Sequence, residues 1–158
     1  MARRVSGGPS WNELQELPEW IDRLSELRYI TLGQNPLRSL PRSLSHPPRL
    51  AALWMFKTSL DEAPAWLADL PALRSLGIGG DWLGELPEWI ADLSELTELS
   101  VQQSGLSSLP PWFSDFRRRK KLWLRENNLR KHRCAQWVTR RLDLSSCGIP
   151  NYLVPCMP

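Results

Sequence analysis

A strict repeat of 23 residues constrains this chain more than any other feature of its sequence. The segments LPEWIDRLSEL, at residues 17–27, and LPEWIADLSEL, at residues 86–96, are nearly identical. Rows of 23 residues that begin at residue 17 place a proline second each time: Pro18, Pro41, Pro64, Pro87 and Pro110. The spacing never changes, so the two similar segments are the first and fourth units of one array.

Apolar side chains recur in fixed columns of this array. In the first unit, Ile30 and Leu32 are separated by one residue, and every later unit repeats such a pair. This alternation is typical of a short strand with one face turned inward. One unit cannot fold alone, because ordering its residues costs more free energy than the burial of its few apolar side chains contributes. The units must therefore stack, so that each covers the apolar face of its neighbour.

The pattern L-x-x-L-x-L-x-x-N/C-x-L lies within each unit, and in the first it reads Leu27, Ile30, Leu32, Asn35 and Leu37. On these residues the chain resembles the leucine-rich-repeat family, specifically the intracellular 23-residue class whose units begin L-P-x-x-I. The resemblance implies an α/β solenoid. Its curved parallel sheet would form the concave side, and short helices or irregular turns would form the convex side.

The repeat also sets the expected domain organisation. We expect a degenerate N-terminal segment at 1–11 and a leucine-rich-repeat solenoid at 12–149, followed by a C-terminal tail at 150–158. The solenoid would contain five 23-residue units and one shorter unit.

Small polar residues occupy the column that usually holds asparagine. At such a turn they can bond the backbone of adjacent coils, which favours a structural role over a catalytic one. The column reads Asn12, Asn35, Thr58, Asp81, Ser104, Asn127 and Cys147.

Tryptophan recurs in the fourth column at the repeat spacing itself. The spacing favours a ladder of stacked rings along one edge of the solenoid over a partner-binding role. Ser43 interrupts this column, so we expect Trp20 to stand apart from Trp66, Trp89 and Trp112.

Two places depart from the pattern. His46-Pro47-Pro48 predicts that the second unit has no regular helix there, because proline lacks a backbone donor and clashes with the preceding turn. Arg119 occupies a column that leucine fills in earlier units, and an unpaired charge in the core is costly. The fifth unit is therefore expected to be distorted.

No motif in the sequence indicates catalysis, a cofactor or a metal. The histidines His46 and His132 lie beside no recurring serine, cysteine or carboxylate that would suggest an activated nucleophile. The glycines of GIGGDWLG, at 77–84, lack the lysine and hydroxyl residue of a phosphate-binding loop. We therefore expect a protein that is not an enzyme.

Length, hydropathy and cysteine usage favour a single cytoplasmic domain. The chain has 158 residues, no apolar run that would span a membrane, and no secretory signal at its basic N-terminus. Its three cysteines cannot all pair within one chain, and their spacing matches no zinc site. A reducing cytosol is the expected setting.

Residues that alternate with the buried strand positions are expected to line the concave wall. Aromatic residues gather in its N-terminal half, beside a strip without side chains, and such residues are enriched at binding hot spots. In an alternative interpretation, Trp54 and Phe56 fold down over their neighbours and cover the missing side chains. The predicted partner-binding residues are Tyr29, Thr31, Trp54, Phe56, Gly77, Gly79, Trp82, Glu98, Gln102, Trp123 and Arg125.

Charge divides the chain into two unlike parts. Residues 1–116 hold 9 Lys and Arg against 15 Asp and Glu, net −6, and residues 117–158 hold 11 against 2, net +9. A basic run attracts anionic partners such as nucleic acid or an acidic membrane surface, although a solvated surface is the more common role. The candidate anionic-partner patch is Arg117, Arg118, Lys120, Lys121, Arg130, Lys131, Arg140 and Arg141.

Three functional interpretations follow. The leading one, which the resemblance also implies, is a non-catalytic protein-protein interaction scaffold that presents its concave wall to another protein or peptide. The second is an electrostatic module at 117–141, with nucleic acid as a less favoured partner. The third is an isolated or engineered repeat fragment that self-associates, because apolar residues follow the last expected strand where a solenoid normally needs a polar cap.

Overall fold

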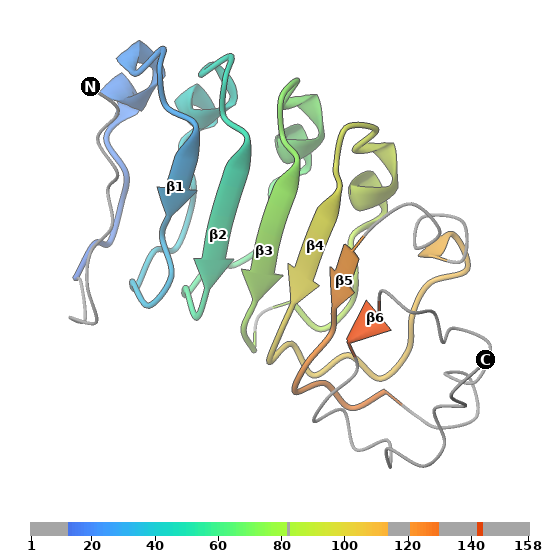
Figure 1. The fold of residues 1–158 in the computed structure, drawn as a ribbon. Coiled ribbons are helices and arrows are strands. Elements are labelled where there is room, and N and C mark those ends of the chain that lie inside the picture. Colours follow the sequence, from blue (N-terminus) through green and yellow to red (C-terminus); the bar gives the residue numbers. More distant parts are fainter. Residues whose placement is uncertain (1–12, 82, 114–120, 130–141, 144–158) are drawn as a thin grey trace.

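The computed structural model describes residues 13–81, 83–113, 121–129 and 142–143. Six parallel strands form one sheet in sequence order, and Figure 1 shows them side by side. The strands are β1 (Tyr29–Thr31), β2 (Ala52–Phe56), β3 (Ser75–Gly79), β4 (Glu98–Val101), β5 (Lys121–Trp123) and β6 (Leu142–Asp143). Four short 3-10 helices lie on one side of the sheet: η1 (Glu19–Arg23), η2 (Arg42–Ser45), η3 (Ala65–Asp69) and η4 (Glu88–Asp92).

The strand register repeats the period of the sequence. Each residue of β1 to β4 that pairs with the next strand does so with the residue 23 positions later, as Ile30 does with Leu53 and Leu53 with Leu76. The last pairing is shorter, because Leu122 pairs with Leu142, which is 142 − 122 = 20 positions later. This is where the sequence predicts a shorter unit.

The recurring prolines begin the 3-10 helices. Those that precede η1 to η4 have φ between −70° and −62°, and the carbonyl of each accepts a hydrogen bond from the N–H three residues later. That bond defines a 3-10 turn, and the proline ring fixes the φ that the entry requires. The pairs are Pro18–Ile21, Pro41–Leu44, Pro64–Leu67 and Pro87–Ile90, at 3.0 to 3.2 Å.

Each repeat unit forms one coil of the solenoid, and the first coil begins at residue 17. The helix of the second coil, η2, is the shortest of the four. It ends at Ser45, and no helix covers His46, Pro47 or Pro48. The prediction from the two prolines is confirmed.

The core lies between the sheet and the 3-10 helices. It contains the inward strand residues and one apolar residue from each helix, such as Ile21 and Leu44. Leu53, Leu76 and Leu99 occupy one column and have no exposed surface. The apolar columns of the sequence therefore become continuous stacks of side chains that run from coil to coil.

The tryptophan column is separated as expected but is not a stack of rings. Trp20 is 56% exposed, whereas Trp66, Trp89 and Trp112 are half-buried against the core. No ring pair joins Trp66 to Trp89 in the part of the chain that the structure describes, so the predicted ring-to-ring contact is not found there. These rings pack against the core, and Trp112 also pairs with Phe113, with ring centroids 6.0 Å apart.

The asparagine column bonds the backbone, as predicted. Asn127 Nδ2 donates to the carbonyls of Val101, Leu124 and Arg125, and its Oδ1 accepts from the N–H groups of Ser104 and Leu106. Asn35 Nδ2 likewise donates to two carbonyls of its own coil, and its Oδ1 accepts from the N–H of Leu14. One buried amide thus fastens two successive coils. Asp81, in the same column, is exposed instead.

Some expectations fall outside the described residues. These are the distorted fifth unit around Arg119, the N-terminal segment 1–11, the C-terminal tail 150–158, and Asn12 and Cys147 of the asparagine column.

Candidate binding surface

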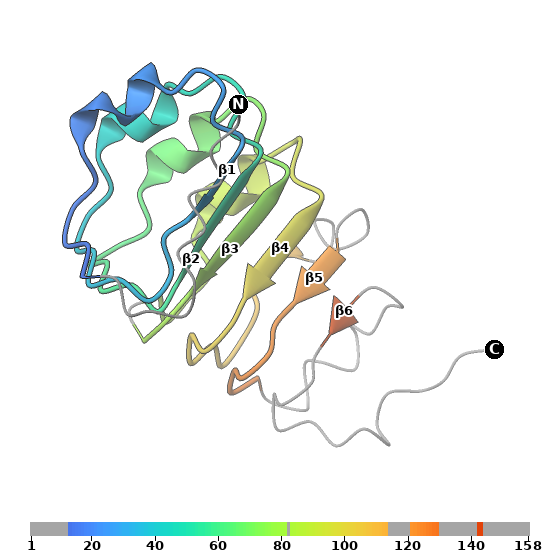
Figure 2. The same ribbon diagram turned by 60° about the vertical axis from the view of Figure 1, so that its left-hand side comes forward.

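The face of the sheet that points away from the 3-10 helices is the predicted concave wall. Figure 2 shows helices on the other face only. Strand residues alternate between the core and this wall, and in β1 Ile30 is buried whereas Tyr29 and Thr31 are exposed. Tyr29 is 62% exposed, more than any other large apolar side chain in the described residues.

Two aromatic rings occupy the middle of the wall. Trp54 and Phe56 project from β2 with ring centroids 5.7 Å apart and planes tilted by 55°. Gly77, on β3, pairs with Trp54 in the sheet. A Cβ atom built on Gly77 would lie 2.5 Å from Trp54 Cε3 and 2.7 Å from Phe56 Cζ. Both rings therefore rest on this glycine.

The positions of these two rings differ from one expectation of the sequence analysis. The sequence predicted exposed aromatics beside a hollow, but the space above Gly77 is filled by the rings of Trp54 and Phe56. Both side chains are half-buried, and neither lies in the aliphatic core. The alternative in which they cover the missing side chain describes this geometry. What the wall offers to a partner is therefore the outer surface of two fixed rings.

The second half of the wall is polar. Lys121 Nζ lies 3.2 Å from Glu98 Oε1, and this ion pair joins β5 to β4. Gln102 Nε2 donates to Ser100 Oγ at 3.0 Å. Trp123, which is half-buried, follows Lys121 after one residue. The wall thus passes from apolar to polar along the solenoid.

Most of the predicted partner-binding residues lie on or at the end of the expected strands. Gly77 and Gly79 are buried, and Thr31 and Arg125 are exposed. Trp82 lies outside the described residues. So do Arg117, Arg118, Lys120, Arg130, Lys131, Arg140 and Arg141 of the anionic-partner patch. Lys121 is the one member of that patch that is described, and Glu98 partly neutralises its charge. An anionic partner at 117–141 stays a prediction.

Replacement of Gly77 by alanine tests the packing of the rings. The new Cβ would lie 2.5 Å from Trp54 Cε3 and 2.7 Å from Phe56 Cζ and would displace both packed rings, so we expect a loss of about 2 kcal/mol in stability. The near-ultraviolet circular-dichroism spectrum should change while the far-ultraviolet spectrum stays the same. Lys121→Ala, on β5 of the same wall and two strands away from Gly77, serves as the control. An unchanged near-ultraviolet spectrum for Gly77→Ala would contradict the packing.

Metal clusters and membrane-spanning helices are both absent from the described residues. They contain no group of three or more His, Cys, Asp or Glu side chains that could hold a metal ion. None of their helices has the length and apolar character needed to cross a membrane.

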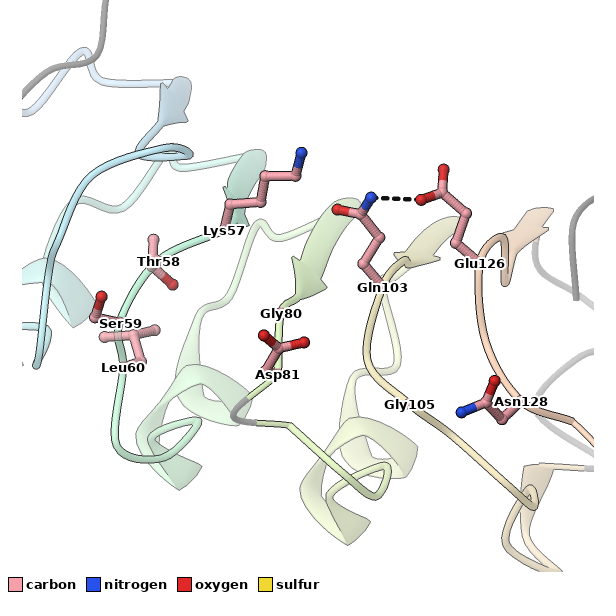
Figure 3. Close-up of a pocket in the computed structure, with 10 residues that line it drawn as sticks. All are labelled: Lys57, Thr58, Ser59, Leu60, Gly80, Asp81, Gln103, Gly105, Glu126 and Asn128. Atoms are coloured by element: carbon pink, nitrogen blue, oxygen red, sulfur yellow. Dashed lines mark hydrogen bonds between the residues drawn. The ribbon is translucent and has the colours of Figure 1, made fainter.

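A second surface was not recognised in the sequence. An open cavity of about 810 Å³ lies at the C-terminal ends of the strands, and we call it the rim cavity. Figure 3 shows side chains from four successive coils around it. One feature of the sequence could have indicated this cavity. Gly80 stands in a column of the repeat that otherwise holds polar side chains: Gln34, Lys57, Gln103 and Glu126. The lining residues used below are Lys57, Ser59, Asp81, Gln103, Glu126 and Asn128.

Comparisons with known proteins show which solved structures have a similar fold. No protein-family model matches the sequence, and no curated protein does. The leucine-rich-repeat domain of the type III effector XopL is 28% identical with a TM-score of 0.65, over 85% of this chain and 50% of that chain. A leucine-rich-repeat protein of Leptospira interrogans is 23% identical with a TM-score of 0.60, over 85% of this chain and 42% of that chain.

A third solved structure agrees. The functional domain of InlJ from Listeria monocytogenes is 23% identical with a TM-score of 0.57, over 80% of this chain and 26% of that chain. The chain thus spans between about a quarter and a half of the length of these proteins. Its fold is a leucine-rich-repeat fold, as the sequence predicted.

Proposed function

We propose that this chain is a non-catalytic protein-binding domain that holds another protein or peptide on its concave wall. The observation that carries the proposal is the pair formed by Trp54 and Phe56, which share the middle of the wall and rest on Gly77. Large aromatic side chains contribute more binding free energy than most other residues at protein interfaces.

The fixed position of the rings supports this role. A flexible side chain loses rotamer freedom when a partner binds, and that loss weakens the complex. Trp54 and Phe56 have already lost this freedom, because each packs against the other and against the backbone of β3. A partner that covers them gains apolar contact with little further ordering.

The polar half of the wall complements the rings. The ion pair between Glu98 and Lys121 and the amide of Gln102 lie beyond β3, so a partner that crosses several coils meets apolar and then polar groups. An apolar centre with a polar margin is the usual composition of a protein interface. We therefore expect the partner to place an apolar side chain over Trp54 and Phe56.

Capture with single variants tests the proposal. We expect Trp54→Ala and Phe56→Ala each to weaken the captured partner by about 2 kcal/mol, roughly thirtyfold in Kd, because each removes a central aromatic contact. The immobilised full chain would be used to capture partners, which mass spectrometry identifies, and calorimetry would then give each affinity. Cross-linking should place the partner on β2 to β4.

The matched control is Trp20→Ala. This tryptophan is 56% exposed and belongs to η1, on the other side of the sheet, so its loss should leave capture unchanged. Far-ultraviolet circular dichroism would check that all three variants stay folded. Equal capture by wild type, Trp54→Ala and Phe56→Ala would rule out the concave wall as the binding surface.

Two finer statements belong to the same proposal. We place the chain in the intracellular 23-residue class, which is supported by the L-P opening of its units and by the proline that begins each 3-10 turn. We also propose a cytosolic setting, which rests on three cysteines that form no even set. All three cysteines lie outside the described residues.

A further inference from the structure

The third coil breaks a backbone conformation that the other coils share at the end of each strand. At this place φ lies between 53° and 60° in four coils, at Gln34, Lys57, Gln103 and Glu126. These values belong to the left-handed helical conformation. Gly80 takes the same place in the third coil, with φ at 136°. Glycine permits this departure, because a side chain would make that φ strained.

The hydrogen bonds between coils break at the same residue. The backbone N–H of Lys57 donates to the carbonyl of Gly79, and that of Gln103 donates to the carbonyl of Arg125. Gly80 makes no equivalent bond to the next coil within the described residues. Its own carbonyl accepts from the N–H of Leu83 at 3.2 Å instead. A local turn thus replaces the connection between the third and fourth coils.

Asp81 is exposed as a consequence. The other four described members of its column are 1% to 7% exposed, and each makes hydrogen bonds to the backbone. Asp81 has no side-chain hydrogen bond or ion pair in the described part of the chain. Leu83 is half-buried, although the residues of its column in the neighbouring coils, Leu60 and Leu106, are at most 1% exposed.

This departure costs stability within the described residues. There it gives up one hydrogen bond between coils and part of the burial of Leu83, and it leaves the Asp81 carboxylate without a side-chain partner. Proteins that follow their own sequence rules elsewhere tend to break them at functional sites. The irregular backbone of the third coil therefore marks this coil as a candidate binding site.

The rim cavity lies at this irregularity. Gly80 contributes no side chain to the row along the strand ends, where it stands between Lys57 and Gln103, and Figure 3 shows Asp81 next to it. Gly80 itself is buried, whereas Gly105 is exposed and no atom lies within 4 Å of a Cβ added to it. Backbone groups are therefore accessible at Gly105.

The charges around the cavity are mixed. Lys57 contributes a cation, and Asp81 and Glu126 contribute carboxylates, so the formal charge is −1. Glu126 Oε2 already accepts a hydrogen bond from Gln103 Nε2. Lys57 has no side-chain partner among the described residues. A ligand thus meets one ammonium group, on Lys57, and one carboxylate, on Asp81, that have no side-chain partner among the described residues.

This composition disfavours an anionic ligand such as phosphate. A phosphate would meet Lys57 alone, against the repulsion of Asp81 and Glu126. A polypeptide can supply opposite charges side by side, together with backbone groups that can bond the exposed backbone at Gly105.

We propose that the rim cavity binds a polypeptide segment that carries an acidic and a basic side chain. The acidic side chain pairs with Lys57, and the basic one pairs with Asp81. Lys57 and Asp81 belong to neighbouring coils, whose strands are about 4.8 Å apart. Side chains two residues apart on an extended peptide point to the same side at a separation of about 7 Å, which long side chains can adapt to this spacing.

The site is distinct from the concave wall. It lies at the ends of the strands, and neither Trp54 nor Phe56 is among the described residues that line it. This inference rests on the proposed function only because both surfaces would bind a polypeptide. Either surface can be tested with the other intact.

Nuclear magnetic resonance of the isotopically labelled full chain tests the proposal. The probes are capped serine–glycine peptides that carry a glutamate and an arginine two residues apart, two glutamates, or two arginines. At millimolar concentration we expect the mixed peptide to shift the backbone amides of Lys57, Gly80, Asp81 and Gly105. Its affinity should exceed that of each like-charged peptide by up to about fivefold, the range of one exposed ion pair.

A change of specificity provides the decisive variant. Asp81→Lys makes both available charges positive, so the preference should invert and the two-glutamate peptide should bind better than the mixed one. Asp81 is exposed, so this substitution should leave the fold intact. Asp22→Lys, at an exposed aspartate of η1, is the matched control and should keep the wild-type preference.

Three outcomes would overturn the proposal. They are an absence of shifts with the mixed peptide, the same preference in wild type and Asp81→Lys, and shifts centred on Trp54, Phe56 and Gly77. The last outcome would instead assign peptide binding to the concave wall. Shifts at the rim that persist in Trp54→Ala, together with failed capture on the concave wall, would refute the proposed function and leave this inference standing.

Discussion

Asn127→Ala is expected to lower the free energy of unfolding by about 3 to 4 kcal/mol, because it leaves several buried backbone groups without partners. The side chain is 3% exposed and makes five hydrogen bonds to the backbone, at 3.0 to 3.2 Å. Three of these reach the fourth coil, at Val101, Ser104 and Leu106. Water cannot replace them without opening the stack between the fourth and fifth coils.

Urea unfolding followed by circular dichroism would measure this loss. Asn128→Ala is the matched control, since this neighbouring asparagine is exposed and its loss should change stability by less than about 0.5 kcal/mol. Hydrogen exchange should show the lost protection first in β4 and β5, because each coil contacts only its neighbours. Equal stability of the two variants would show that the buried amide does not fasten the coils.

Gly79→Ala is expected to destabilise the protein by about 3 kcal/mol, at the upper end of the cost of overpacking. An added Cβ would lie 2.0 Å from the carbonyl oxygen of Gln102 and 3.0 Å from its backbone nitrogen. A flexible side chain could move away from such a contact, but backbone cannot. The third and fourth coils would have to separate at the end of β3.

Gly105→Ala provides the comparison for this variant. Gly105 has φ at 63°, and no atom lies within 4 Å of an added Cβ, so its replacement should cost only about 1 kcal/mol of backbone strain. Thermal unfolding of the two variants would separate steric overlap from the effect of φ. Similar melting temperatures for Gly79→Ala and Gly105→Ala would contradict the steric explanation.

The repeat made most of the fold predictable. Pro18 and Pro41 each determine the backbone conformation of one 3-10 turn. Ile30 and Leu32, two positions apart, each belong to a column of buried side chains. Neither feature depends on distant contacts. The same local chemistry occurs at each 23-residue step, so the strands had to align and their apolar columns had to meet. The role of Asn127 was predictable for the same reason, because its hydrogen bonds follow from its place at the turn.

The candidate sites were less predictable. Tyr29, Trp54 and Phe56 were placed on the concave wall by alternation alone, but their partner-binding role stays a prediction. Alternation does not say whether a ring points outward or lies over a neighbour, because that depends on the side chain opposite it in the next strand. The rim cavity was missed because Asp81 reads in sequence as an ordinary member of the asparagine column.

The two glycines of β3 show where the sequence stops being sufficient. In sequence, Gly77 and Gly79 form one strip without side chains, and both read as space for a partner. In the structure, Gly77 is covered by the rings of Trp54 and Phe56, whereas Gly79 touches the backbone carbonyl of Gln102. The sequence by itself determined the period, the stacking of the coils and the face on which each residue lies, since these depend on local periodicity. Only the tertiary structure decided what fills the space above each residue, because that space is shaped by groups 23 positions away in the chain.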